Sequence, residues 1–183
     1  MRIDAPRVVT PRIDPGVPVF ALGRYAGARR QAIVALKDRG RTDLAVPLAG
    51  WLGLGVHRLL EWGLLDVPLT IVPAPTRGWA ARRRGGDPVT HIATLATGGH
   101  PHITVVRALR MKALARDSAG LSPAERERNI AGRVLLTRRS APADREVLLV
   151  DDIVTTGATA RESVRVLQSS GIRVAAVLAL AAA

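Results

Sequence analysis

Short runs of apolar residues, separated by helical patterns, most restrict what this chain can fold into. They lie at residues 69–73, 102–106, 146–150 and 172–180. A strand that is apolar at nearly every position is buried on both faces, which is typical of a parallel sheet in a layered protein. We therefore expect an α/β fold in which a mostly parallel sheet is covered by helices on both faces.

The segments between these runs predict the covering helices. We expect helices over about 26–37, 43–63 and 156–170, another that begins with Asp87 as its N-cap, and a short one from a capping box at Ser122. A further strand is predicted at 134–137. In the second helix, Gly50, Gly53 and Gly55 favour close packing against a neighbour, because no strand precedes them as a dinucleotide-binding turn requires.

Length and composition favour one domain without a linker. Residues 1–183 are expected to form it, with 1–24 as an extended, proline-containing lead-in. The chain has no cysteine, which excludes disulfides, cysteine-ligated zinc and thiol catalysis. No signal core is visible, and charged residues interrupt the most apolar stretch, residues 44–65. We expect a soluble, cytoplasmic protein with no membrane span.

The basic residues are nearly all arginines. The formal net charge is +12, and only Lys37 and Lys112 of the 27 basic residues are lysines. Because arginine presents a planar fork that suits phosphate, the excess indicates a polyanionic ligand, either a phosphorylated small molecule or a nucleic acid. A genomic base composition that favours arginine explains the same excess, so the charge alone does not decide.

The stretch VLLVDDIVTTGAT, residues 147–159, carries the strongest functional signal. Because burying two carboxylates is unfavourable, we expect Asp151 and Asp152 to follow the strand and face a solvent crevice or a partner. The next five residues predict a turn whose N–H groups and hydroxyls, at a helix N-terminus, favour a phosphate. A ribose 5-phosphate has both hydroxyls and a phosphate. The alternative is a helix N-cap beside two incidental surface aspartates.

Ligands of parallel sheets bind beyond the carboxyl ends of the strands. Three segments should therefore meet at one edge of the sheet: the turn after Pro73, the loop after Val106 and the aspartates after Val150.

The same 13 residues resemble the motif with which type I phosphoribosyltransferases bind phosphoribosyl pyrophosphate (PRPP). In that family the two acidic residues hold the ribose hydroxyls, the loop holds the 5-phosphate, and Mg²⁺ bridges the hydroxyls and the pyrophosphate. The resemblance implies a type I phosphoribosyltransferase-like fold in which Asp151 and Asp152 orient PRPP and contact Mg²⁺ only indirectly. It assigns PRPP binding to Asp151, Asp152, Thr155, Thr156, Gly157, Ala158 and Thr159.

Three further segments resemble the ComF family, competence-related proteins with this fold. They are RYAGARRQAIVALKDRGR (24–41), IVPAP (71–75) and LSPAERERNIAG (121–132). The matching residues outside IVPAP include Tyr25, Gly27, Lys37, Gly40, Arg126 and Asn129. The resemblance implies a protein that binds PRPP with Mg²⁺, or another ribose 5-phosphate ligand, and could transfer phosphoribosyl to a nucleobase-like acceptor. The alternative is a non-catalytic protein of DNA uptake or repair that binds a helicase or single-stranded DNA.

The chain departs from the ComF pattern at three places. It has none of the usual N-terminal cysteine-rich zinc module. The family's RGFNQ segment is represented by residues 84–88, RGGDP, and the glutamine before the LS block is Ser118. The first departure argues against a zinc-dependent DNA contact, and the other two leave the substrate contacts open.

The turn after Val72 is expected to bind pyrophosphate, which needs N–H groups and a cation near the end of a strand. This loop comprises Pro73, Ala74, Pro75, Thr76 and Arg77, with Arg77 as the cation that assists departure. A surface arginine in a proline-rich turn is an equal alternative for Arg77. The resemblance also implies a mobile loop or hood within 107–133, where Arg110, Lys112 and Arg116 shield the pyrophosphate.

Two other groups of residues have less specific interpretations. The run Arg82-Arg83-Arg84 could clamp pyrophosphate, bind a nucleic-acid backbone or form a solvated helix end. Base stacking needs aromatic residues, and only Trp79 lies nearby in the sequence, which weakens the nucleic-acid interpretation. His100 and His102 resemble half of a metal site, but without a third ligand nearby they are more typical of a loop.

Overall fold

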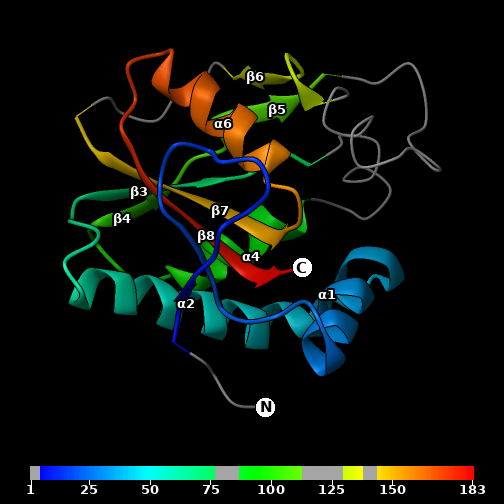
Figure 1. Ribbon diagram of the computed structural model, residues 1–183. Helices are drawn as coiled ribbons and strands as arrows, with labels where there is room; N and C mark the ends of the chain where they lie inside the picture. Colours follow the sequence, from blue (N-terminus) through cyan, green and yellow to red (C-terminus); the bar gives the residue numbers. More distant parts are fainter. Residues whose placement is uncertain (1–4, 77–86, 113–129, 138–143) are drawn as a thin grey trace.

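A six-stranded sheet forms the centre of the molecule (Figure 1). The computed structural model describes residues 5–76, 87–112, 130–137 and 144–183. The strand order is β1-β2-β8-β7-β3-β4; every neighbouring pair is parallel except β1 and β2. The strands are β1 Arg7–Val8, β2 Val19–Ala21, β3 Leu69–Pro73, β4 Ile103–Val105, β7 Glu146–Val154 and β8 Val174–Ala182.

Helices cover both faces of the sheet (Figure 1). The helices α1, α2 and α4 pack on one face, and α6 packs on the other together with a two-stranded antiparallel ribbon. The helices are α1 Gly27–Arg39, α2 Ala45–Glu61, α4 Pro88–Ala96 and α6 Ala158–Gln168, and a 3₁₀ turn, Thr42–Leu44, precedes α2. The ribbon consists of β5 Leu109–Met111 and β6 Val134–Leu136. The expected α/β fold with a mostly parallel sheet and helices on both faces is confirmed.

The apolar strands are buried as their sequences predict. Leu69, Ile71 and Leu148 are fully buried in the core that faces α2 and α4, whereas Val147 and Leu149 belong to the core that faces α6. The sheet thus separates two apolar layers, which explains why its central strands lack an alternating polar face.

Several boundaries differ from the predictions. β7 was expected to end at Val150 but continues to Val154, because its last residues pair with β8 as far as Ala182. The predicted strand 172–180 lies at Val174–Ala182, and the helix expected from residue 156 begins at Ala158. Inter-strand pairing overrides the local polarity that suggested an earlier end.

Two segments for which no sheet strand was predicted contain strands. The lead-in contributes β1 and β2, and β2 pairs with β8 in the main sheet. The segment that begins at Arg107, predicted as part of a mobile loop or hood, contains β5, which pairs with β6 and buries Leu109 against the core on the α6 side. The predicted strand at 134–137 therefore exists, but it lies in the ribbon and not in the main sheet.

The glycines of α2 serve packing, as the sequence indicates. A Cβ at Gly55 would lie 2.6 Å from a methyl group of Leu22, and one at Gly53 would lie 3.1 Å from the carbonyl oxygen of Ala96. Asp87 caps α4 as predicted, accepting a hydrogen bond from the Val89 N–H at 3.3 Å. Within the described ranges, no helix is long and apolar enough to cross a membrane.

Candidate functional site

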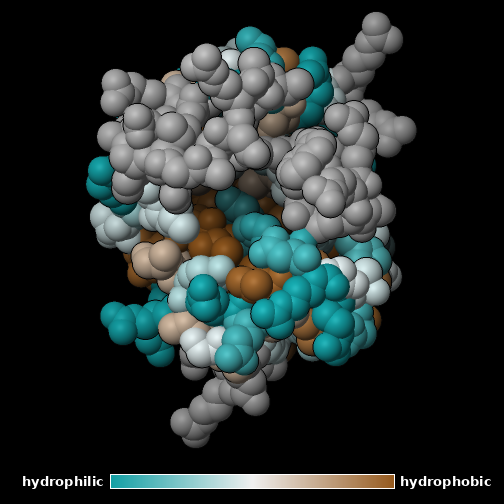
Figure 2. Space-filling view, turned by 90° about the vertical axis from the view of Figure 1, so that its right-hand side faces the viewer, coloured by the Kyte–Doolittle hydropathy of each residue, from teal (hydrophilic) through white to brown (hydrophobic). Residues whose placement is uncertain are grey.

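The carboxyl ends of β3 and β7 lie side by side. The two strands pair in parallel register, with Pro73 opposite Val150, and the Ala74 N–H donates to the Val150 carbonyl at 2.7 Å. Beyond β4, the Val106 N–H donates to the Ile71 carbonyl at 2.9 Å, which holds the third predicted segment at this edge. Figure 2 views this side of the molecule, where hydrophilic and apolar residues are mixed on the described surface.

Asp151 and Asp152 lie within β7 and not after it, which corrects the sequence prediction. Successive side chains of a strand point to opposite faces. The two carboxyl groups nevertheless stay close to each other, because the side chain of Asp151 turns back to hydrogen-bond Asp152. Asp152 continues the side of Leu148 and Val150, which faces the core under α1 and α2. Asp151 is half-buried, and its Oδ1 accepts from the Asp152 N–H at 2.8 Å.

The buried carboxylate has a cationic partner. Only 9% of the Asp152 side chain is exposed, and its Oδ2 lies 2.6 Å from Nζ of Lys37, in the last turn of α1. Of the two predicted alternatives, a crevice or a partner, Asp152 therefore has the partner: the ion pair with Lys37 compensates its burial. Lys37 matched a family signature in the sequence, but nothing local indicated that it reaches β7.

The environment of Asp151 disfavours its charged form. Burial and the neighbouring charge of Asp152 raise the pKa of Asp151 well above its usual value, and Lys37 opposes this increase only in part. A carboxylate in this situation gains from a ligand that donates hydrogen bonds to it, because such bonds stabilise the charged form.

The hydroxyl-rich loop after β7 leads directly into α6. Gly157 is the N-cap, with φ of 87°, and the hydroxyl of Thr156 accepts from the Ala158 N–H at 3.4 Å. The other N–H groups of the first helical turn have no acceptor within the helix, so a phosphate could accept from them. The predicted loop residues Thr155 to Thr159 therefore surround the start of α6.

The lead-in fixes the position of this loop. The Ile13 N–H donates to the Thr156 carbonyl at 2.9 Å, and a Cβ at residue 157 would collide with the Ile13 carbonyl oxygen. Glycine is thus required at 157 by its positive φ and by the chain that crosses it. No local pattern in the sequence indicates the second reason.

A small cavity of about 110 Å³ adjoins the turn after β3. Pro73, Ala74, Pro75 and Thr76 line one side of it. Arg107 and Arg110, both exposed, line it from the segment that follows β4, together with Asp87, the N-cap of α4, and Thr90 of α4. This side of the edge therefore offers two guanidinium groups to an anion, and sequence reasoning had singled out only Arg110.

The remaining predicted contacts lie outside the described residues. They are Arg77, Trp79, Arg82, Arg83, Arg84, Arg116, Ser118, the capping box at Ser122, Arg126 and Asn129. Lys112 follows β5 directly, and its N–H donates to the Arg133 carbonyl at 2.8 Å. His100 and His102 lie in the turn between α4 and β4, as expected for loop residues.

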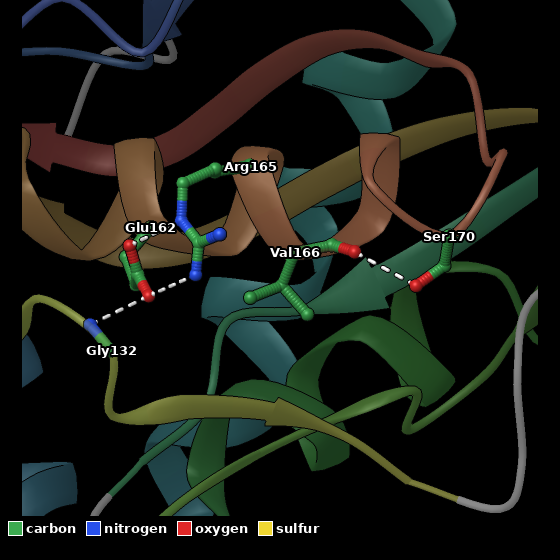
Figure 3. A network of polar contacts seen from close by, with 5 residues as sticks. All are labelled: Gly132, Glu162, Arg165, Val166 and Ser170. Atoms are coloured by element: carbon green, nitrogen blue, oxygen red, sulfur yellow. Dashed lines mark hydrogen bonds and ion pairs between the residues drawn. The ribbon is translucent and has the colours of Figure 1, made fainter.

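A second cavity, of about 530 Å³, opens beside the first turns of α6. Ile13, Gly132 and Ala158 contribute to its wall, as do Arg161, Glu162 and Arg165. Figure 3 shows how Glu162 is held: its Oε1 accepts from the Gly132 N–H at 2.8 Å and pairs with Arg165 at 2.7 Å. These contacts lower the pKa of Glu162 below its usual value, with the hydrogen bond from Arg165 as the largest cause.

Magnesium fits this edge only in the company of a ligand. In the described segments no group of three or more His, Cys, Asp or Glu side chains could hold a metal ion. Asp152 already has Lys37 as its cation. A magnesium ion would therefore depend on oxygen atoms of the ligand, with Asp151 as the available protein carboxylate nearby.

Comparisons with known proteins give structural similarity but no family. No protein-family model matches the chain, and no curated protein matches it. Among solved structures, the chain is similar to a hypoxanthine phosphoribosyltransferase from Staphylococcus aureus, with a TM-score of 0.41 and 17% identity. The match covers 74% of this chain and 61% of that one, so this chain spans less than two thirds of it. The functional interpretation therefore depends on the geometry of the site.

Proposed function

We propose that this chain binds a phosphoribosyl ligand, PRPP or another ribose 5-phosphate, at the carboxyl edge of β3 and β7. The observation that carries the proposal is the parallel pairing of these strands, in which Pro73 lies opposite Val150. This pairing brings the turn after β3 next to Asp151 and to the loop that opens α6. A phosphate, ribose hydroxyls and a pyrophosphate need these three kinds of contact.

Each part of the ligand has a chemically suited partner. The N–H groups and hydroxyls of Thr155–Thr159 donate hydrogen bonds to the 5-phosphate, helped by the dipole of α6. Asp151 accepts hydrogen bonds from the ribose hydroxyls. On the pyrophosphate side, Arg107 and Arg110 line the cavity that adjoins the turn after β3 and serve as its cations, since the Ala74 N–H already donates to Val150 and Pro75 has no N–H. Magnesium bound with PRPP would neutralise part of the pyrophosphate charge.

A transfer reaction would break the bond between C1 of the ribose and a pyrophosphate oxygen. A bond from C1 to the nucleophilic atom of a nucleobase-like acceptor would form, and that acceptor would lose a proton. The residues named above would contribute by binding and by stabilising the leaving pyrophosphate through electrostatic contacts. Binding without transfer identifies the non-catalytic alternative, in which the ligand regulates the binding of a helicase or single-stranded DNA.

The deciding experiment is calorimetric titration with PRPP, with and without magnesium, on the wild type and on Asp151→Asn. Asp144→Asn is the matched control, because Asp144 is exposed beyond the other end of β7. We expect magnesium-dependent binding that Asp151→Asn loses and Asp144→Asn retains. Absence of wild-type binding at millimolar PRPP would contradict the proposal. A screen of nucleobase acceptors for pyrophosphate release then separates transfer from binding alone.

A further inference from the structure

Lys37 is an unusual member of α1, because it points its charge at the sheet. The helix carries four basic residues (Arg29, Arg30, Lys37 and Arg39), and it buries only Ile33 and Leu36. Lys37 follows Leu36 directly, is 29% exposed in its side chain and reaches the buried Oδ2 of Asp152 at 2.6 Å. A helix with so little buried apolar surface gains much of its fixed position from such a contact.

The beginning of α1 is attached to the same edge of the sheet. The Tyr25 N–H donates to the Ala182 carbonyl, at the end of β8, at 2.7 Å. The guanidinium of Arg30 lies 5.8 Å from the centroid of the Tyr25 ring, and that of Arg29 lies 5.5 Å from Trp51 of α2. The pair of Lys37 and Asp152 provides the corresponding attachment at the other end of the helix.

Asp152 is poorly placed to serve a ligand as well. Its carboxylate points into the α1 side of the sheet, and moving Lys37 away would leave a buried charge without its counter-ion. Asp151 is the more exposed of the two carboxylates, and the strand that carries it leads into the loop that begins α6. The two adjacent carboxylates thus differ in exposure, and Lys37 pairs with the buried one.

We propose that Lys37 is a positioning residue that takes Asp152 as its structural partner, leaving Asp151 as the carboxylate that contacts the ribose. The inference rests on the proposed phosphoribosyl site. It replaces a symmetric acidic pair by one carboxylate that attaches α1 and one that binds ligand.

The test uses a double-mutant cycle in the full chain. The variants are Lys37→Met, Asp152→Asn, their combination and Asp151→Asn, with Arg39→Met as the control because Arg39 is an exposed cation in the same turn. Two quantities are measured: the affinity for ribose 5-phosphate, and the amide hydrogen exchange of α1.

Hydrogen exchange tests the attachment of α1. Lys37→Met and Asp152→Asn should each accelerate exchange in α1 about tenfold, as expected for loss of a charge-assisted contact. The double variant should exchange no faster than the faster single variant, since both remove one interaction. Arg39→Met and Asp151→Asn should leave exchange unchanged. Additive effects of the two single changes would overturn the attachment.

Ligand affinity tests the division of roles. Asp151→Asn should weaken ribose 5-phosphate binding about tenfold or more, whereas the double variant should stay within about threefold of the wild type. A double variant as weak as Asp151→Asn would overturn the inference, because Asp152 would then contact the ligand. If Asp152→Asn does not fold, Lys37→Met measured against Arg39→Met decides in its place: faster α1 exchange and near-normal binding support the inference, and unchanged exchange overturns it.

Failure of the proposed function gives a different pattern. If the wild type binds neither ribose 5-phosphate nor PRPP, the proposed function and the ligand role of Asp151 both fail. Coupled exchange effects of Lys37 and Asp152 would then still establish the attachment of α1, and uncoupled effects would remove it too.

Discussion

Two acidic side chains on consecutive elements, Glu162 of α6 and Asp151 of β7, have opposite environments. Glu162 is 7% exposed, and it receives the Gly132 N–H and two hydrogen bonds from Arg165 (Figure 3). Its pKa is lowered. Asp151 is half-buried beside a second carboxylate, and its pKa is raised.

The difference indicates how each carboxylate is used. A carboxylate whose donors come from the protein stabilises the fold in its charged form and has little left to offer a ligand. A carboxylate that is buried beside another negative charge reduces stability, and a ligand that donates hydrogen bonds to it recovers that loss. Glu162 is accordingly a structural residue, and Asp151 is the candidate for ligand binding.

The comparison is tested most strongly by removing each charge and measuring ligand affinity. Asp151→Asn should weaken PRPP binding about 30-fold, the loss expected for a charge-assisted hydrogen bond of about 2 kcal/mol. Glu162→Gln should leave the affinity within about threefold, because its oxygens are already occupied by protein donors. Calorimetric titration measures both. Equal losses in the two variants would remove the distinction between the two carboxylates.

When stability is measured instead of affinity, the substitution of Glu162 should have a larger effect than that of Asp151. Glu162→Gln should lower the free energy of unfolding by about 1–2 kcal/mol, because a buried charged acceptor is lost from Gly132 and Arg165. Glu61→Gln is the control: Glu61 pairs with Arg58 on an exposed face of α2, where the loss should stay below about 0.5 kcal/mol. Urea denaturation monitored by circular dichroism measures the difference. A loss no larger than that of Glu61→Gln would show that Glu162 is not structural.

The pKa of Glu162 also predicts how this stability depends on pH. Its pKa is lowered in the folded state, so its contribution is present above the unfolded value and is lost as the pH falls through the folded value. The destabilisation by Glu162→Gln should therefore decrease under acidic conditions. A destabilisation that does not change with pH would exclude charge as its cause.

The layered fold could be predicted because the patterns that indicate it lie within short stretches of adjacent residues. The apolar runs at 69–73 and 146–150 each report burial on both faces, and Asp87-Pro88 reports a helix start. β5 escaped prediction because three residues, Leu-Arg-Met, carry too little periodicity, and only pairing with β6 makes them a strand. The end of β7 was misplaced because its last residues obtain their hydrogen bonds from β8, which the local sequence does not report.

Prediction of the site was limited in the same way. The order of carboxylates, hydroxyls and glycine in 151–159 indicated a phosphate and ribose site from adjacent residues alone. The contact between Lys37 and Asp152 joins residues that are distant in the sequence, and so does that between Ile13 and the loop at Thr156. Such contacts follow from the packing of α1 and of the lead-in on the sheet, which the local patterns do not specify.

Removing a cation near the proposed pyrophosphate position should have a smaller effect on affinity. Comparing PRPP with ribose 5-phosphate then tests which part of the ligand this cation contacts. Arg110→Gln should weaken PRPP binding about fivefold, and leave ribose 5-phosphate binding unchanged, because Arg110 lines the cavity beside the turn after β3. Arg145→Gln is the control for loss of one positive charge near the start of β7. Titrations with the two ligands measure the selectivity. Equal weakening for both ligands would indicate that Arg110 acts through the overall charge of the protein and not through a contact with pyrophosphate.

The smallest expected effect is that of Asp151 on the stability of the protein. Its sign distinguishes a carboxylate used for binding from a structural one. The pKa of Asp151 is higher in the folded state than in the unfolded chain, so the folded state holds the proton more tightly. Wild-type stability should therefore decrease as the pH rises from the unfolded value, about 3.9, through the raised folded value. Asp151→Asn cannot ionise and avoids this loss. Its melting temperature should accordingly exceed that of the wild type at neutral pH, and the difference should narrow as the pH falls towards 4. Thermal unfolding across this range measures the difference, with Asp144→Asn as the control that should follow the wild type.

A stabilised variant that has lost ligand binding would identify Asp151 as a residue kept for binding at the expense of stability. A destabilised variant at neutral pH would instead make Asp151 a structural carboxylate like Glu162, and the contrast between the two would disappear.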